Sequence, residues 1–168
     1  MPSAAVKRIL SKDMKAIQQN ELEKNGIYIE FNEKDIMEAY ALIIGPKDTC
    51  YADGLLYFKI NFPTNYPFSP PKVMYLSRGS IRIHPNLYTG RSNEDYLGKV
   101  CLSLLGTWSG PQWTSIMDIT SILLSIQSLL TDDPIKQEPG YGNSNGTLNV
   151  KYNACVNYET LRTLILRN

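Results

Sequence analysis

Four short apolar segments lie close together between residues 26 and 76, and no helix-like segment separates one from the next. They read GIYIEFN (26–32), EAYALIIG (38–45), GLLYFKINFP (54–63) and KVMYL (72–76). Turn signals such as Gly45-Pro46 and Asp53-Gly54 lie between them. A parallel crossover needs about a dozen residues or more, so strands linked this closely pair antiparallel. The order therefore predicts a four-stranded antiparallel meander.

Three segments outside the meander carry apolar residues at helical spacing and predict helices. They cover residues 4–22, residues 114–134 and residues 147–166. In the central segment, Ser115 and Asp118 resemble a capping pair, and Asp132-Asp133-Pro134 marks the end. In each segment, the apolar residues at helical spacing form a stripe that we expect to face the core. The stripes are Val6, Ile9, Leu10, Met14 and Ile17 in the first segment, Ile116, Ile119, Leu123, Ile126 and Leu130 in the central one, and Val150, Ala154, Tyr158, Leu161 and Ile165 in the last. Helices on either side of a meander predict the α+β class.

The composition limits the classes of function. A chain of 168 residues suits one core, and we expect a single domain over residues 1–168. A net charge of +1 gives no field to recruit nucleic acid or an anionic membrane, so neither is an expected partner. The N-terminus lacks the apolar core of a secretory signal, and no apolar run approaches the roughly 20 residues of a membrane span.

Three cysteines and one histidine are widely scattered in the chain. Cys50, Cys101 and Cys155 have no paired spacing, which argues against a disulfide framework and against a zinc site. We therefore expect a reducing compartment, the cytoplasm or the nucleus, and no metal.

The stretch from His84 to Trp108, HPNLYTGRSNEDYLGKVCLSLLGTW, contains the histidine and one cysteine. With the proline-rich FPTNYPFSPPKV before it and DDP after the central helix, this ordered set resembles the ubiquitin-conjugating enzymes. The resemblance runs from about Lys7 to about Leu166. The segments CLSLLGTWSGPQW, SIQSLL and EPGY are most similar to the Z-type members and to their giant relatives with inhibitor-of-apoptosis repeats. The resemblance implies the fold of that family, in which the active-site loop lies between the sheet and the central helix, and it implies that no cofactor is needed.

The resemblance implies that Cys101 accepts ubiquitin from an activating enzyme as a thioester and passes it to a substrate lysine or a ligase cysteine. A free cysteine is otherwise commonly a buried hydrophobe, which is the interpretation kept for Cys50 and Cys155. His84 is restricted by the following proline and is implied to be structural, bonded to nearby backbone. The chain therefore has no spare base, which suits an enzyme whose thiol meets an already activated thioester.

Two further residues have both a catalytic and a structural interpretation. Asn86 either stabilises the oxyanion of the thioester carbonyl or closes its loop by hydrogen bonding to backbone, and one side chain can do both. Asp133 matches the acidic gate that orients the incoming lysine and takes its proton, with Asp132 second. The alternative for both aspartates is plain helix termination by solvated charges.

The implied partner surfaces lie in three places. Lys7, Arg8 and Lys12 match the helix that meets activating enzymes, although an ordinary solvated face has the same appearance. Phe62 and Pro111 match two loops that the family offers to RING-type ligases; ligases of the HECT type are the cysteine-bearing alternative. An apolar tip on a stiff proline-rich loop loses little entropy on binding.

Neighbouring aromatic residues have more structural interpretations. Tyr66 and Phe68 can anchor their loop in the core, and Trp108 and Trp113 are expected to pack rather than to contact a partner. The polar segment TGRSNEDYL, residues 89–97, looks like an insertion and is expected to be a surface loop at the mouth of the site.

Three alternative functions remain. A non-catalytic variant that binds ubiquitin is disfavoured because Cys101 lies in an intact GKVCLSLL context. A cysteine hydrolase is disfavoured by the missing base. A carrier of another ubiquitin-like modifier would use the same thioester chemistry, and the sequence does not exclude it.

Overall fold

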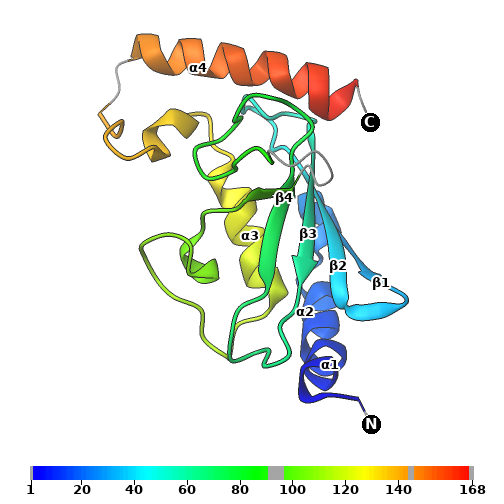
Figure 1. Cartoon of the computed structure of the whole chain (residues 1–168). Helices are drawn as coiled ribbons and strands as arrows, with labels where there is room; N and C mark the ends of the chain where they lie inside the picture. The colour runs from blue at the N-terminus through cyan, green and yellow to red at the C-terminus, as the bar shows by residue number, and fades with distance from the viewer. Residues whose placement is uncertain (1, 91–96, 144–145, 167–168) are drawn as a thin grey trace.

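The computed structural model describes residues 2–90, 97–143 and 146–166. Its sheet is antiparallel in chain order (Figure 1): β1 Ile27–Asn32, β2 Asp35–Ile44, β3 Leu55–Asn61, β4 Lys72–Leu76 and β5 Leu97–Lys99. The predicted α+β class and the meander are confirmed. The predicted strand number is wrong, because the described residues form a sheet of five strands and not four.

Strand β5 is hidden in the sequence because it has three residues and no apolar alternation. It pairs with the end of β4, from Met74 opposite Lys99 to Leu76 opposite Leu97. A Cβ added at Gly98 would lie 1.5 Å from the backbone oxygen of Tyr88, so only glycine permits this close approach. The expected surface loop at residues 89–97 therefore ends in a strand, and residues 91–96 of it lie outside the described residues.

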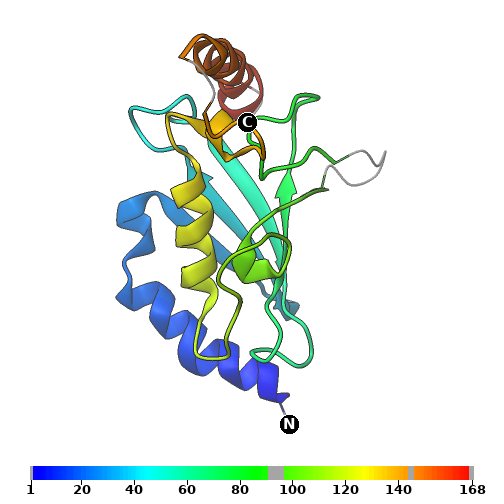
Figure 2. The same cartoon turned by 90° about the vertical axis from the view of Figure 1, so that its left-hand side faces the viewer.

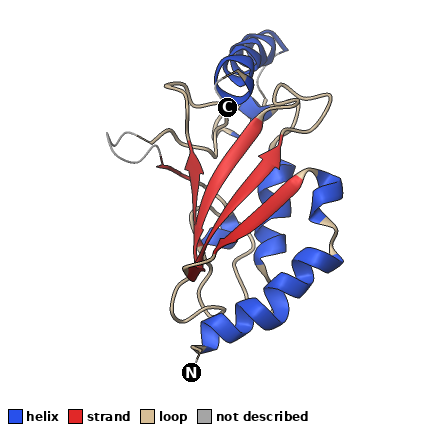
Figure 3. Cartoon of the chain, turned by 90° about the vertical axis from the view of Figure 1, so that its right-hand side faces the viewer, coloured by secondary structure: helices blue, strands red, loops and turns tan. Residues whose placement is uncertain are grey.

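The helices follow the three predicted segments. The N-terminal helix comprises α1 Ala4–Arg8, a π-helical turn over Ile9–Asp13 and α2 Met14–Gln19; the central helix is α3 Ile119–Leu129; the C-terminal helix is α4 Gly146–Glu159, continued by a π-helical stretch over Thr160–Ile165. Short 3₁₀ turns cover Leu22–Asn25, Ser103–Leu105 and Pro134–Gln137. Figure 2 and Figure 3 show the N-terminal helix and α3 on one side of the sheet, with α4 across its end.

The core lies between the inner face of the sheet and α3. Alternate residues of β2 and β3 point into it: Ala41, Ile43, Phe58 and Ile60 are at most 2% exposed. From α3, the side chains of Ile119, Ile122, Leu123 and Ile126 are fully buried. Truncating one such side chain to alanine typically costs about 2–5 kcal/mol, so this layer fixes the position of everything built on it.

Helix α3 begins later than the capping pair predicts. Asp118 is the N-cap itself, and its carboxylate accepts from the backbone N–H groups of Thr120 and Ser121. Satisfying these first-turn donors is what starts a helix. Ile116 lies before the cap and is 77% exposed, so its expected inward position is wrong, whereas Leu130 at the other end is buried.

The C-terminal helix packs through a different face from the one its apolar stripe predicts. Val150 is 68% exposed and Tyr158 is 62% exposed, while Val156, Thr160, Thr163 and Leu164 are buried. The contact face is selected by small and polar groups that reach the loop between β2 and β3. Thr160 donates to the backbone oxygen of Cys50 at 3.1 Å, and a Cβ on Gly54 would lie 2.8 Å from Thr160 Cγ2.

Candidate active site

Cys101 lies two residues beyond the end of β5, at the start of the loop that leads to α3. Its backbone N–H donates to Asn86 O at 2.8 Å, and the residue is 3% exposed. Burial raises the pKa of the thiol; the positive charges of Lys99 and Arg82 lower it, and the carboxylate of Glu138 raises it again. The net direction is upward, so the resting form near neutral pH is the thiol.

Asn86 holds the segment of the cysteine through its side chain. Its Nδ2 donates to the backbone oxygen of Cys101 at 2.8 Å, and its backbone N–H donates to His84 Nδ1 at 2.9 Å. The residue is 4% exposed, and its Oδ1 has no hydrogen-bond partner among the described residues. Because Nδ2 carries two hydrogens, one remains available beside the bond that closes the loop.

His84 is fully buried and both ring nitrogens are occupied by backbone. Nδ1 accepts from the N–H of Asn86, so Nε2 carries the proton and donates to Leu129 O at 2.9 Å. Burial is the largest cause that lowers the pKa of His84 to about 4; the bond to Leu129 acts in the opposite direction, and the charge of Arg82 lowers the pKa further. A neutral, fixed imidazole of this kind ties the His84–Asn86 segment to the end of α3.

A charged group beside this segment was not singled out from the sequence. Arg82 Nη2 lies 2.5 Å from Glu138 Oε2, and its guanidinium carbon is 4.7 Å from the ring centroid of Tyr88. Glu138 follows the 3₁₀ turn after α3, so this pair joins that segment to the chain on both sides of His84. In the sequence, Glu138 belongs to the segment EPGY, which was used only to recognise the subfamily.

Asp133 has both carboxylate oxygens engaged. Oδ2 pairs with Lys136 Nζ at 2.6 Å, and Oδ1 accepts from Asn149 of α4. Asp132 is exposed, and its backbone oxygen accepts from Asn153 at 2.6 Å. The two aspartates thus end the segment after α3 and anchor α4, whereas Glu138 is the carboxylate whose charge acts on the Cys101 thiol.

The other two cysteines differ in their exposure. Cys50 is buried, and burial raises its pKa to about 11, while Cys155 is exposed on α4. Within the described ranges, no three His, Cys, Asp or Glu side chains cluster in a way that could hold a metal ion. Over the same ranges, no helix is both long and apolar enough to cross a bilayer.

The three N-terminal cations differ in availability. Lys7 is exposed. Arg8 is not the free cation that we expected, because it pairs with buried Asp13 at 3.0 Å, donates to Met117 O at 2.6 Å and is 13% exposed in its side chain. Lys12 donates to the backbone oxygen of Ile116.

The expected exposure of Phe62 is wrong. Phe62 follows β3 and continues the inward alternation of its residues, so it is 5% exposed, stacked on Phe31 and edge-on to Tyr66. The exposed aromatic side chain of the proline-rich loop is Phe68, at 80%, which we expected as a core anchor. Tyr66 does anchor the core, donating to Asp13 at 2.5 Å.

Pro111 is exposed on the neighbouring loop. The expected packing role of Trp113 agrees with its geometry: Nε1 donates to Pro67 O at 2.7 Å, and the ring lies 6.0 Å from that of Tyr66. This bond ties the loop of Pro111 to the loop of Phe68, so the two exposed tips are presented together.

Comparison with known proteins identifies the family. Residues 9–155 match the model of the ubiquitin-conjugating enzyme family. Ubiquitin-conjugating enzyme E2 Z of Xenopus tropicalis is 38% identical over 143 residues, covering 83% of this chain and 44% of that protein. The human E2 Z is 39% identical over 143 residues, covering 83% and 38% respectively. These similarities confirm the expected resemblance to the Z-type members.

Two further matches extend the same picture. Probable ubiquitin-conjugating enzyme E2 25 of Arabidopsis thaliana is 43% identical over 145 residues, which are 83% of this chain and 21% of that protein. The chain thus spans less than half the length of these curated relatives. The crystal structure of a putative ubiquitin conjugating enzyme from Plasmodium yoelii has the same fold, with a TM-score of 0.71, 24% identity and coverage of 98% and 97% of the two chains.

Proposed function

Because this chain belongs to the ubiquitin-conjugating enzyme family, we propose that it accepts ubiquitin from an activating enzyme as a thioester on Cys101 and transfers it to a substrate lysine or a ligase cysteine. The observation that carries this proposal is the bond from Asn86 Nδ2 to Cys101 O. It holds a carboxamide beside a thiol, on a segment whose histidine has no nitrogen free to act as a base.

Loading is an exchange of thioesters. Cys101 Sγ attacks the ubiquitin carbonyl on the activating enzyme, a new C–S bond forms, and the thiolate of the activating enzyme leaves. Both thiols are similar leaving groups, so the step needs no strongly activated nucleophile. The raised pKa of Cys101 is compatible with this chemistry and unfavourable for a hydrolase.

Transfer to an amine needs more help. The lysine nitrogen attacks the thioester carbonyl, negative charge develops on its oxygen, and Cys101 leaves as the thiolate. We assign the stabilisation of that oxygen to the second hydrogen on Asn86 Nδ2, the one not used in the bond to Cys101 O. Losing one such donor typically costs about 3 kcal/mol in the transition state.

The attacking lysine must also lose a proton, because its ordinary pKa is about 10.4. We assign the acidic group that orients it to Glu138, whose charge acts at the Cys101 thiol and which Arg82 holds in place. Asp133 is the alternative, disfavoured because Lys136 and Asn149 occupy its oxygens.

Partner surfaces follow from exposure. Lys7 and Lys12 on the N-terminal helix are the cations offered to an activating enzyme. Phe68 and Pro111 form the apolar tips offered to a RING-type ligase, with Phe68 in the place first assigned to Phe62. Ligases of the HECT type would instead receive ubiquitin on their own cysteine.

The setting of the protein is part of the proposal. Three free cysteines suit the cytoplasm or the nucleus, where thiols stay reduced. Transfer of another ubiquitin-like modifier is the second candidate, and the choice of activating enzyme decides between them.

The test of the proposed chemistry replaces Cys101 with serine. Incubation with ATP, ubiquitin-activating enzyme and ubiquitin should give a reductant-sensitive adduct on the unmodified protein and a reductant-resistant ester on Cys101→Ser. An adduct of unchanged sensitivity on the serine variant would place the thioester elsewhere and overturn the assignment. Replacing ubiquitin and its activating enzyme with those of another modifier tests the second candidate in the same assay.

A further inference from the structure

Asp13 is a carboxylate in an otherwise apolar row of the N-terminal helix. It follows Ala5 and Ile9 at four-residue spacing, and all three residues are fully buried. Asp13 closes the π-helical turn Ile9–Asp13, and turns of this kind are frequent at functional sites. Replacing a buried ion pair by apolar side chains is often neutral or stabilising. Stability alone therefore does not account for a carboxylate at this position.

The Asp13 carboxylate joins three segments that are far apart in the sequence. Oδ1 accepts from the hydroxyl of Tyr66 at 2.5 Å and from the backbone N–H of Ile119 at 2.9 Å. Oδ2 pairs with Arg8 Nη1 at 3.0 Å. Arg8 in turn donates to Met117 O at 2.6 Å, and its guanidinium carbon lies 5.6 Å from the centroid of the Tyr66 ring. The N-terminal helix is thus bonded to the proline-rich loop and to the start of α3.

These two segments lead to the apolar tips of the proposed ligase surface. The proline-rich loop carries Phe68, and the loop that runs into α3 carries Pro111. The bond from Trp113 Nε1 to Pro67 O, at 2.7 Å, joins the two loops directly. Asp13 adds a second link, because it bonds to the proline-rich loop and to the first residue of α3 at once.

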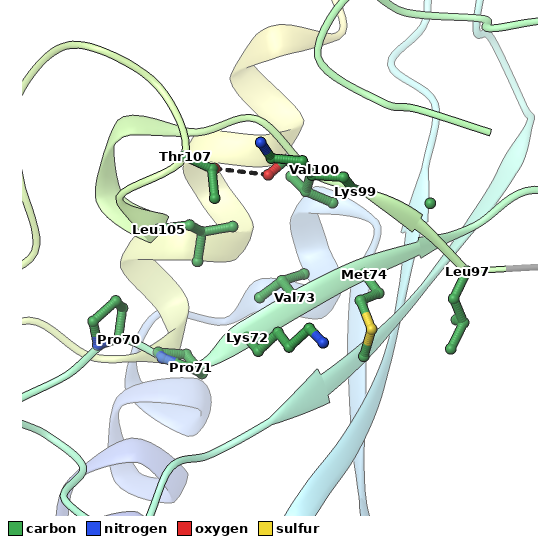
Figure 4. A pocket seen from close by; sticks show the side chains of 11 residues that line it. Pro70, Pro71, Lys72, Val73, Met74, Leu97, Lys99, Val100, Leu105 and Thr107 are labelled. Carbon is green, nitrogen blue, oxygen red and sulfur yellow. Dashed lines mark hydrogen bonds between the residues drawn. The ribbon is translucent and has the colours of Figure 1, made fainter. Parts of the chain in front are cut away.

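The other end of the proline-rich loop has less support. Pro70 and Pro71 line a hollow of about 500 Å³ that has Val73 and Leu105 on its walls (Figure 4). Side chains that border a hollow lack packing contacts on that side. The position of the loop, and of the tip that it carries, therefore depends on the bonds at its other end, which include the bond from Tyr66.

We infer that Asp13 and Tyr66 form a positioning pair for the ligase-stimulated step, because their bond holds Phe68 and Pro111 in the relative position that a RING-type ligase contacts. The inference rests on the proposed function for the role of that surface. Loops already held in the bound arrangement lose less conformational entropy on binding. The pair should therefore act on the affinity for the ligase and leave the chemistry at Cys101 unchanged.

The first experiment needs no ligase and measures hydrogen exchange of the Trp113 indole N–H by NMR. The chain has two tryptophans, and Trp108→Phe assigns the signals. Tyr66→Phe removes the hydroxyl and keeps the ring, and it should speed this exchange roughly 3–10-fold by loosening the loop. Thr160→Val is the matched control, because it removes a buried hydroxyl that bonds to Cys50 O at the other end of the sheet (Figure 1). The control should leave the Trp113 exchange unchanged.

The second experiment titrates discharge from the loaded protein with an isolated RING domain, chosen from a panel because it stimulates the unmodified protein most. Tyr66→Phe should raise the half-saturating RING concentration roughly 3–10-fold, the factor that one hydrogen bond ordinarily contributes. The maximal rate, the loading and the unstimulated discharge should not change. Asp13→Asn, which leaves Arg8 without its charged partner, should act in the same direction. On a Phe68→Ala background the effect of Tyr66→Phe should shrink, because it acts through Phe68.

Equal acceleration of the exchange by Tyr66→Phe and Thr160→Val would show a general loss of stability and would overturn the proposal. An unchanged half-saturating concentration would also overturn it, as would an effect of Tyr66→Phe that adds fully to that of Phe68→Ala. If no thioester forms, or if no RING domain stimulates the unmodified protein, the proposed function fails. The exchange experiment then still decides whether the bond between Tyr66 and Asp13 orders the two loops.

Discussion

Lowering the pH should destabilise this protein through one residue, His84. Its ring is fully buried, Nδ1 accepts from Asn86 N–H, and Nε2 donates to Leu129 O. A second proton on Nδ1 would face a donor and would bury an unpaired charge. The folded pKa is accordingly about 4, against about 6.5 in an unfolded chain.

The sign and size follow from proton linkage. Between pH 6.5 and 4 the unfolded state binds a proton that the folded state does not, so the free energy of unfolding falls as pH falls. With these two pKa values, the loss between pH 7.5 and pH 5 is about 2 kcal/mol, rising to about 3 kcal/mol below pH 4. For a chain of this length, 2 kcal/mol corresponds to a decrease in Tm of roughly 4–8 °C.

The assay uses the fact that the chain has one histidine. Its imidazole resonances, followed by NMR, should titrate near pH 4 in the folded protein. Denaturant unfolding at pH 7.5 and pH 5 should give the loss above, and His84→Gln, which keeps a donor for Leu129, should lose about 2 kcal/mol less. The variant is needed because Asp13, whose pKa is raised by burial, titrates with the opposite sign. An imidazole that titrates at 6.5 in the folded protein would refute the reasoning without any variant.

Three further predictions concern the site and its surfaces. Asn86→Ala should load nearly normally but discharge to free lysine about 100-fold more slowly, because the amine step depends on the oxyanion donor; discharge at the unmodified rate in a folded variant would remove that role. Glu138→Gln should slow discharge to free lysine more than Asp133→Asn does, and the reverse order would return the acidic role to Asp133. Phe68→Ala should weaken ligase-stimulated discharge with unchanged unstimulated discharge and unchanged thermal stability, as read by single-turnover assays and a melting curve; an unaffected stimulation would exclude Phe68 from the ligase surface.

Local patterns in the sequence sufficed for the meander and for the existence of each helix. Phe58 and Ile60 alternate with polar or half-buried residues, and Ile119, Leu123 and Ile126 form a stripe, because one face of each element is buried. Burial on one face leaves a periodic pattern in the sequence, which can be read directly. Strand β5 was not predicted because its three residues are positioned by pairing with β4, and a tertiary contact of this kind leaves no periodic pattern in the sequence. The buried face of the C-terminal helix was predicted wrongly, because a hydrogen bond and close packing at Thr160 decide the contact instead of the apolar stripe through Val150 and Tyr158.

The site shows the same division. Cys101, Asn86 and His84 fall within one ordered motif, so the sequence alone brought them together. Glu138 lies far from these residues in the sequence and is held near them by its ion pair with Arg82. A contact between distant residues leaves no local sequence pattern, so it was not predicted. The predicted roles of Phe62 and Phe68 were reversed. Phe62 continues the alternation of β3 and is buried, whereas Phe68, two residues after the buried Tyr66, is exposed.

The most direct measurement of the central claim is the intact mass of the protein after incubation with ATP, ubiquitin-activating enzyme and ubiquitin. The account predicts one added ubiquitin, removed by reductant, absent from Cys101→Ala and retained when Cys50 and Cys155 are both changed to alanine. An adduct that persists in Cys101→Ala, or no adduct on the folded protein while another conjugating enzyme in the same tube is loaded, would contradict it.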